Sequence, residues 1–396
     1  MKVSNRIEEM QFSPIRKMVP FAEAAKKQGK SVYHLNIGQP DIETPKEFFD
    51  AVRNFDEKVL AYAFSQGLPE TIESFSNYYK ELGMNYEKDE ILITNGGSEA
   101  LFFAFVAVCD YGDEVLIPEP FYTNYNSFSQ SAGAVVVPVP TSAADGFKLP
   151  SMEVFESKIT KKTKAIMLSN PGNPTGAVYG KDDMEKVKAL ALKHNLFIIS
   201  DEVYKEMVYD GLKFTSFSQI EGIEDRVILT DSISKRYSAC GARIGCIASK
   251  NKEVMANIMK LCQGRLCVAT IEQVGAAALA NVSPKYMEDV VEEYQKRRDV
   301  VYNALKQIDG VICEKPTGAF YIMAKLPVDN AEDFAKWMLT DFSINDKTVM
   351  VAPGAGFYAT EGLGLDEIRI SYVLKEDDLK DAMNILAEAL KAYNKR

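Results

Sequence analysis

The chain has 396 residues, 46% of them hydrophobic, and its 46 Lys and Arg against 56 Asp and Glu give a formal net charge of −10. This apolar content suffices for one large domain or two of ordinary size, whereas the negative balance argues against nucleic-acid binding, because phosphate neutralisation needs clustered positive charge. The longest uncharged apolar run, residues 100–109, is too short to span a bilayer, and the N-terminal stretch MKVSNRIEEM lacks the apolar core of a signal peptide, so we expect a soluble, cytoplasmic protein without membrane contact.

Short apolar segments alternate with helical ones between about residues 90 and 250. The β-rich segments predict strands at 90–94, 114–118, 134–139, 164–169, 196–200, 226–230 and 244–249. Amphipathic patterns predict helices at 98–110 and 181–195. Continuous apolar strands separated by such helices are typical of an α/β domain whose mostly parallel sheet is covered by helices on both faces.

The pattern changes after about residue 285. A long charged helix is expected at 283–308, followed by apolar segments at 318–326, 348–354 and 367–373 and a closing helix at 376–396. This order predicts a smaller α+β unit. We therefore expect three parts: an N-terminal segment, 1–45, that packs with the small domain, a large domain, 46–285, and the small domain, 286–396.

Histidine and cysteine offer little for catalysis. With only His34 and His194, neither a zinc site nor a Ser–His–Asp triad is expected, so no metal is predicted. The six cysteines form no CxxC pair, which predicts reduced and mostly buried thiols. Any catalysis then depends on Lys, Tyr, Asp and Arg.

Polar clusters follow four of the predicted strands. They are NGGSEA (95–100), NPGNPTG (170–176), DEVY (201–204) and DSISKRY (231–237). In open parallel sheets, ligands bind beyond the carboxyl ends of the strands. The four clusters therefore predict one shared pocket at that edge of the sheet.

Two of these clusters have glycines and prolines that control the backbone. The small residues before Ser98 let backbone N–H groups approach an anion at a helix N-terminus, although Ser98 could instead be an ordinary helix cap. In NPGNPTG the prolines fix the φ angles and the glycines permit tight turns, so that Asn170 and Asn173 can be aimed at a ligand.

Charged residues at strand ends indicate ion binding. Asp201 ends an apolar strand, where a carboxylate needs a cation such as a protonated ring nitrogen, with Tyr204 nearby; the alternative is a helix cap. Arg243 and Arg369 each precede an apolar stretch and could clamp a phosphate or carboxylate through two hydrogen bonds. The alternative for both arginines is a structural salt bridge.

The stretch TDSISKRY (230–237) fits two chemistries. Ser232 and Lys235 satisfy S-x-x-K, in which lysine activates a serine nucleophile, but the companion motifs S-D-N and K-T-G are absent. The alternative is a lysine amine that forms an imine with a carbonyl cofactor. A nicotinamide site at GAGFYA (354–359) is disfavoured, because Pro353 precedes it and no helix follows closely.

These motifs together resemble the class I pyridoxal-phosphate-dependent aminotransferases of fold type I, and within them the aspartate aminotransferase-like group. The likeness runs over nearly the whole chain, in the order LNIGQPDIETP, YAFSQGLPE, TNGGSEALF, EPFYTNY, NPGNPTG, DEVY, SISKRYSACGARIG and RISYV. NPGNPTG and SISK with its following arginine are specific in combination, whereas GGSEA alone is weak. The resemblance implies an enzyme that exchanges an amino group between an amino acid and a 2-oxo acid.

The resemblance also implies roles around the cofactor ring. Lys235 matches the catalytic lysine that holds pyridoxal 5'-phosphate as an imine, and Asp201 matches the carboxylate that keeps the pyridine nitrogen protonated. Asn173 and Tyr204 match the pair that hydrogen-bonds the phenolic oxygen. Tyr122 falls where an aromatic ring stacks on the pyridine.

Further matches imply phosphate and substrate contacts. The phosphate-binding positions are Gly97, Ser98, Ser232, Ser234 and Arg243. Tyr62 matches a tyrosine that reaches the phosphate of the neighbouring subunit, which implies a homodimer with shared active sites. The substrate is implied to bind at Gly38, Asn173 and Arg369, with its α-carboxylate held by Gly38 and Arg369.

The amino donor stays open at this stage. Aspartate or glutamate is the first expectation; aromatic or other neutral amino acids, or a lyase or decarboxylase reaction in a similar pocket, are the alternatives. Some aspartate-specific relatives have lysine at the position of Ser98, and this chain does not. Our hypothesis is that Arg265, in CQGRLCVAT, binds the distal carboxylate, the alternative being a structural or intersubunit salt bridge.

Overall fold

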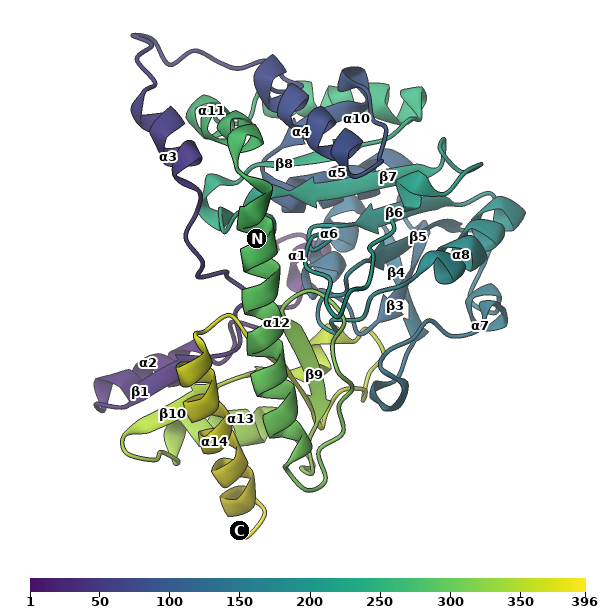
Figure 1. Ribbon diagram of the computed structural model, residues 1–396. Coiled ribbons are helices and arrows are strands. Elements are labelled where there is room, and N and C mark those ends of the chain that lie inside the picture. Colours follow the sequence, from purple (N-terminus) through teal and green to yellow (C-terminus); the bar gives the residue numbers. More distant parts are fainter.

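Seven strands form one sheet in the computed structural model, which describes all residues 1–396 (Figure 1). They are β2 (Ile91–Thr94), β3 (Glu114–Glu119), β4 (Val135–Pro140), β5 (Thr163–Ser169), β6 (Phe197–Asp201), β7 (Val227–Ser232) and β8 (Gly245–Ala248). Their order across the sheet is β2-β8-β7-β6-β5-β3-β4, and β8 alone runs opposite to the other six strands. The predicted α/β class and all seven predicted strands are confirmed.

Helices cover both faces of this sheet because its strands are apolar on both sides. In β5, Ala165 and Met167 belong to one core cluster, whereas Ile166 and Leu168 belong to another. The two clusters lie on opposite faces, since successive side chains of a strand alternate. Helices that cover the sheet are α3 (Lys46–Arg53), α4 (Pro69–Glu81), α5 (Gly96–Val108), α6 (Asn124–Ala132), α7 (Met152–Glu156), α8 (Lys181–His194), α10 (Lys252–Arg265) and α11 (Thr270–Ala278).

A second group of elements lies at the other end of the molecule (Figure 1). Its strands form a parallel pair, β1 (Ser31–His34) with β10 (Lys347–Met350), and an antiparallel sheet of β11 (Ala352–Pro353), β12 (Glu367–Ser371) and β9 (Tyr321–Lys325). Around these strands lie α2 (Val19–Lys27), α13 (Ala331–Thr340), α14 (Glu376–Tyr393) and the long α12 (Pro284–Lys306), which share a core cluster of 36 buried residues. The N-terminal strand thus pairs with a segment near the C-terminus, while the exact domain boundaries near 45 and 285 stay predictions.

Local signals explain the start of α12, and one predicted segment differs. Ser283 precedes the helix, its Oγ accepts a hydrogen bond from Lys285 N at 3.3 Å, and Pro284 occupies the first helical position, where its missing N–H is harmless. The predicted continuous segment 348–354 is divided into β10 and β11, which belong to different sheets. Val351, between them, is buried.

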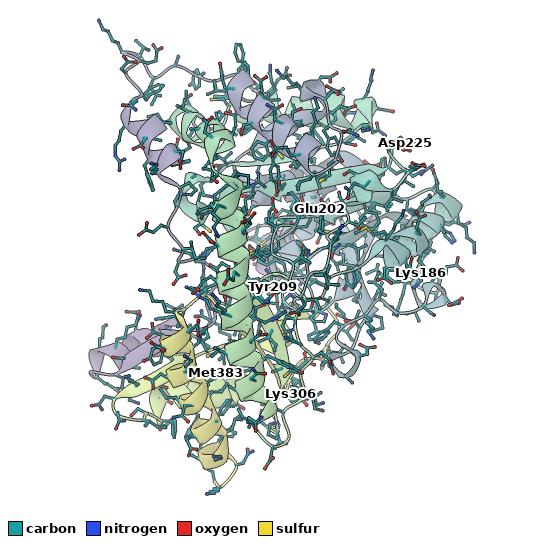
Figure 2. All side chains as sticks on the ribbon, viewed as in Figure 1. Lys186, Glu202, Tyr209, Asp225, Lys306 and Met383 are labelled. Carbon is teal, nitrogen blue, oxygen red and sulfur yellow. The ribbon has the colours of Figure 1, made fainter.

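Burial separates the interior from the surface as composition predicts. Glu202 is fully buried within the sheet domain, whereas Lys186 and Asp225 are exposed on its outside (Figure 2). The six cysteines are free thiols, four of them buried. None of the helices combines the length and apolar character that crossing a membrane requires.

Candidate active site

A pocket of about 410 Å³ lies beyond the carboxyl ends of β2, β5, β6 and β7. Its lining includes twelve of the fourteen residues to which the sequence assigns a cofactor or substrate role: Gly38, Gly97, Ser98, Tyr122, Asn173, Asp201, Tyr204, Ser232, Ser234, Lys235, Arg243 and Arg369. The reversed direction of β8 brings Arg243, just before its first residue, to the same edge of the sheet. The sheet therefore gathers four separate sequence clusters in one place, as parallel topology predicts.

Lys235 lies in a single helical turn, α9 (Ile233–Arg236), that follows β7 directly. Its Nζ donates a hydrogen bond to Gly38 O at 2.8 Å and lies 3.9 Å from Cys240 Sγ. Ser232 Oγ instead contacts Ser234 Oγ at 2.7 Å and donates to the Ile244 carbonyl at 2.9 Å. The lysine amine and Ser232 are thus not hydrogen-bonded to each other, which disfavours the serine nucleophile.

Asp201, at the end of β6, is held by a residue that the sequence did not single out. Tyr125 OH donates to Asp201 Oδ2 at 2.5 Å, and Val203 N donates more weakly to Oδ1 at 3.4 Å. Burial raises the pKa of Asp201 to about 6, although the Tyr125 hydrogen bond lowers it. No helix begins here, so the alternative of a helix cap is wrong. The sequence signal for Tyr125 was its position three residues after Tyr122 in EPFYTNY. In the structure the centres of the two rings lie 5.5 Å apart, edge to face.

Arg369 is a buried guanidinium without a carboxylate partner. Its Nη1 donates to Asn173 Oδ1 at 2.9 Å and its Nη2 to Asn36 O at 2.5 Å, while Nε has no partner at all. The guanidinium carbon lies 4.4 Å from the centre of the Tyr321 ring and 4.8 Å from that of Phe357. Burial lowers the pKa of Arg369. The alternative of a structural salt bridge is therefore wrong, and a buried cation that faces a pocket in this way needs an anion from outside.

A tyrosine pair closes the same side of the pocket. Tyr204 OH and Tyr321 OH lie 2.8 Å apart. Gly38 must be glycine at this point, because a Cβ there would lie 1.7 Å from Tyr321 Oη. Tyr321 was missed in the sequence, since it starts a strand in GAFYIMAKL and belongs to none of the polar clusters at strand ends.

The start of α5 forms a cradle for an anion. The helix begins at Gly96, so Ser98 lies within its first turn and the alternative of a cap at Ser98 is wrong. A Cβ on Gly96, which has φ +75°, would lie 2.5 Å from Arg243 Nη2. The backbone of Arg243 is in the left-handed helical conformation, with φ 54°, and its Nη1 donates to Cys240 O at 3.2 Å. Helical N–H groups, hydroxyls and a guanidinium are the donors that a phosphate prefers.

The two asparagines of NPGNPTG have different tasks. Asn173 faces the pocket through its contact with Arg369. Asn170 instead braces the segment: its Nδ2 donates to Tyr179 O at 3.1 Å, and Tyr179 N donates to its Oδ1 at 2.9 Å. The expected rigidity therefore arises from this pair of bonds as well as from the prolines.

Besides Asn170, two predicted residues lie outside the pocket lining of the single chain. Arg265 ends α10, and its Nη2 donates to Ser65 O at 3.1 Å and Ile93 O at 3.3 Å, while Nη1 lies 3.7 Å from Glu99 Oε2. Tyr62 is 81% exposed. Their proposed roles stay predictions. One pocket cation went unnoticed in the sequence: Arg16, in SPIRKM, lines the pocket beside Ser13 and Ile15.

Known proteins similar to this chain are aminotransferases. The family model described as aminotransferase class I and II matches residues 30–386. A probable aspartate aminotransferase of Methanocaldococcus jannaschii is 34% identical over 394 residues, which cover 98% of this chain and 99% of that protein. An aromatic-amino-acid aminotransferase of Thermococcus litoralis is 31% identical, and the match covers 99% of each. The crystal structure of an aspartate aminotransferase from Thermotoga maritima gives a TM-score of 0.89 at 31% identity, covering 98% of this chain and 100% of that one.

Proposed function

The chain belongs to the class I and II aminotransferases, and from this premise we propose that it transfers the amino group of a dicarboxylic amino acid, aspartate or glutamate, to a 2-oxo acid, with pyridoxal 5'-phosphate as cofactor. The proposed setting is a cytoplasmic homodimer. The single observation that carries amino-acid transfer is Arg369, a fully buried guanidinium at the pocket with no protein carboxylate beside it; the dicarboxylic donor rests on Arg16.

The donors of the pocket fit pyridoxal phosphate. Ser98, Ser232, Ser234 and Arg243 surround the start of α5 and offer hydroxyl and guanidinium groups to a phosphate. Asp201 offers a carboxylate to a ring nitrogen, and its bond from Tyr125 leaves the other oxygen, Oδ1, with only a 3.4 Å backbone contact. When bound, the cofactor supplies a ring that withdraws electrons from the substrate's α-carbon.

The protein's own part is to hold, orient and move protons. We assign to Lys235 the covalent attachment of the cofactor and, once released, the transfer of a proton to and from the α-carbon. Asn173 and Tyr204 would hold the ring through its phenolic oxygen, and Tyr122 would pack against it. Gly38 and Arg369 hold the substrate α-carboxylate, Arg369 with two roughly parallel hydrogen bonds.

A second carboxylate needs a second cation, and Arg16 is the candidate that the pocket offers. Its side chain is exposed, lines the pocket and forms no ion pair with the protein. Arg265 already lies 3.7 Å from Glu99 and donates from Nη2 to two backbone carbonyls, although its Nε and Nη1 are buried without a hydrogen-bond partner. We therefore propose Arg16 for the distal carboxylate and keep Arg265 as the rival. The apolar neighbours Ile15 and Ile37 are what a neutral or aromatic donor would contact instead.

The experiment is a panel of amino acids added one at a time to the purified holoenzyme. Aspartate and glutamate are expected to convert the visible spectrum of the bound cofactor from its aldehyde to its amine form, and a 2-oxo acid to reverse it. Conversion by no amino acid would contradict the proposed function, and conversion by aromatic amino acids alone would contradict the dicarboxylic donor.

Substituting the two arginines tests the donor assignment. Arg16→Ala is expected to lower kcat/KM for aspartate by about 10- to 100-fold, the value of a hydrogen bond to a charged group, and to leave alanine turnover nearly unchanged. Lys17→Ala is the matched control, because Lys17 is exposed next door but pairs with Glu332 at 2.5 Å. A selective loss in Arg265→Gln instead would assign the distal carboxylate to Arg265.

Exposed apolar side chains support the dimer. Val3, Ile7 and Phe12 of the N-terminal arm and several side chains of residues 59–64 are each more than half exposed. Neighbouring exposed apolar side chains, such as those of residues 59–64, mark a surface that a partner covers. Sedimentation is expected to give twice the mass of the chain.

Tyr62→Phe, in which only a hydroxyl is lost, should keep the dimer but weaken cofactor binding about tenfold if Tyr62 reaches the neighbouring phosphate site. Unchanged cofactor binding would show that Tyr62 does not contact that site.

A further inference from the structure

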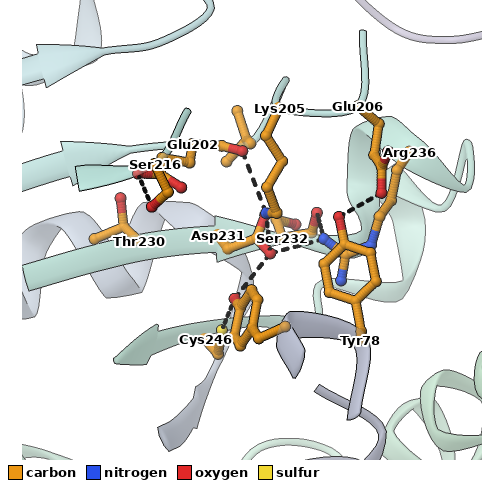
Figure 3. A network of polar contacts seen from close by, with 12 residues as sticks. Tyr78, Glu202, Lys205, Glu206, Ser216, Thr230, Asp231, Ser232, Arg236 and Cys246 are labelled. Carbon is orange, nitrogen blue, oxygen red and sulfur yellow. Dashed lines mark hydrogen bonds and ion pairs between the residues drawn. The ribbon is translucent and has the colours of Figure 1, made fainter. Parts of the chain in front are cut away.

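A buried carboxylate behind the pocket joins separate segments of the chain (Figure 3). Asp231 Oδ2 accepts hydrogen bonds from Lys205 Nζ at 2.6 Å, Arg236 Nη1 at 2.7 Å and Tyr79 OH at 2.9 Å. Burial would raise the pKa of Asp231, but the charges of Arg236 and then Lys205 outweigh burial and hold it at about 2. Asp231 is therefore ionised at neutral pH and bridges two cations.

Each cation directly follows a pocket residue in the chain. Lys205 comes after Tyr204, in the turn beyond β6, and Arg236 comes after Lys235, in α9. Asp231 itself precedes Ser232 in β7. Because successive side chains of a strand point to opposite faces, Asp231 points away from the pocket that Ser232 lines. Its hydrogen bonds can therefore hold the backbone in place without occupying the pocket.

The turn that holds Lys235 needs such support. Helix α9 has four residues, and a helix of this length has no stability of its own. Its start is capped by Ser232, whose Oγ accepts from Ser234 N at 3.1 Å. Its end is fixed by the bond from Arg236 to Asp231. The direction of the lysine between these two ends therefore depends on both contacts.

Aromatic rings of α4 keep the cations in place. The Arg236 guanidinium lies 4.1 Å from the centre of the Tyr78 ring and 5.3 Å from that of Phe75, and Lys205 Nζ lies 5.4 Å from the centre of the Tyr79 ring. Such contacts attract a cation to the ring face. The bridge is thus built into the packing between α4 and the sheet edge.

We propose that Asp231 is a positioning residue for amino transfer. By bridging Lys205 and Arg236, it fixes α9 relative to the turn after β6. The amine of Lys235 is thereby aligned with the groups that hold the cofactor ring. This inference rests on the proposed function.

The test compares two buried carboxylates in the holoenzyme. Asp231→Asn is expected to lower kcat about 100-fold, the loss that a misplacement of about 1 Å causes, while KM for the amino acid stays within about threefold because Arg369 is untouched. The matched control is Glu202→Gln: Glu202 is equally buried, but its Oε1 accepts only from the Ser200 and Ser216 hydroxyls, at 2.8 Å each. The control should keep native kcat.

A second readout does not involve the reaction. In the cofactor-free protein, amide hydrogen exchange in segments 202–208 and 231–238 is expected to be about tenfold faster in Asp231→Asn than in wild type. Glu202→Gln should leave exchange in 231–238 unchanged. If both kcat and exchange stay native in a folded Asp231→Asn variant, Asp231 does not position Lys235.

A double variant distinguishes the effect of losing the bridge between Lys205 and Arg236 from the effect of changing the net charge. Asp231→Asn leaves two buried cations unpaired, whereas Asp231→Asn with Lys205→Met restores the net charge of the trio without restoring the bridge. Its melting temperature should recover towards wild type, and its kcat should stay at least about tenfold low. Native kcat in the double variant would overturn the proposal. If the single variant does not fold, the kcat of the double variant alone decides whether Asp231 positions Lys235. A wild-type enzyme that converts no amino acid would contradict the proposed function instead.

Discussion

Replacing Lys235 with alanine is expected to lower the rate of amino transfer by about 10⁴-fold or more, with the protein still folded. The side chain has a single strong contact, from Nζ to Gly38 O at 2.8 Å, so its loss disturbs little of the packing. In the proposed mechanism, catalysis then loses both the covalent attachment of the cofactor and the proton carrier, and Ser232 cannot replace either function. The measurement is single-turnover conversion of the holoenzyme with aspartate.

Two controls keep this result interpretable. Lys213→Ala removes an exposed lysine outside the pocket and should leave the rate unchanged. Borohydride reduction of the wild-type holoenzyme followed by peptide mapping should place the cofactor on Lys235. A label on another lysine, or a Lys235→Ala variant with native turnover, would overturn the assignment of the site.

The sheet and the position of the pocket could be predicted because their signals are local. A strand buried on both faces is a continuous apolar run, and the polar residue after it is adjacent in sequence, as Asp201 is to β6. Parallel direction then brings such residues to one edge. No distant contact has to be known for this step.

The supporting residues could not be found in this way. Tyr125 and Asp201 are separated by 76 positions, and Tyr204 and Tyr321 by 117. Asp231 stands inside an apolar strand, where the sequence shows a charge but not the Lys205 and Arg236 that neutralise it. Such partners become visible only when elements are placed in space, since no periodicity connects them.

Arg16 and Arg265 show the same limit for substrate choice. Both are single arginines without a strand-end position, so neither has a local signal that separates a ligand contact from a salt bridge. The structure gives Arg265 protein partners and leaves Arg16 at the pocket without one. A ligand contact is therefore distinguished from a salt bridge only by tertiary neighbours: Arg265 lies beside Glu99, whereas Arg16 faces the pocket.

Arg369→Lys is expected to raise KM for the amino acid by about 100-fold while changing kcat much less. Lysine keeps the positive charge but is a point donor, so it cannot bond Asn173 Oδ1 and Asn36 O and still present two parallel donors to a carboxylate. The α-carboxylate is bound equally in the substrate and in the transition state. Losing the arginine contact to this carboxylate therefore weakens substrate binding rather than the chemical step. The measurement is steady-state kinetics over a wide range of aspartate concentrations.

The matched control is another buried arginine with its own carboxylate. Arg298 is fully buried on α12 and donates to Asp210 Oδ2 at 2.7 Å and Oδ1 at 2.9 Å, outside the pocket. Arg298→Lys should lower the melting temperature and leave KM unchanged, because only a protein pair is weakened. If Arg369→Lys instead lowers kcat and leaves KM native, Arg369 does not hold the substrate carboxylate. The buried guanidinium, which has no carboxylate partner in the protein, would then serve the cofactor or the fold, and the choice of a carboxylate substrate would lose its main support.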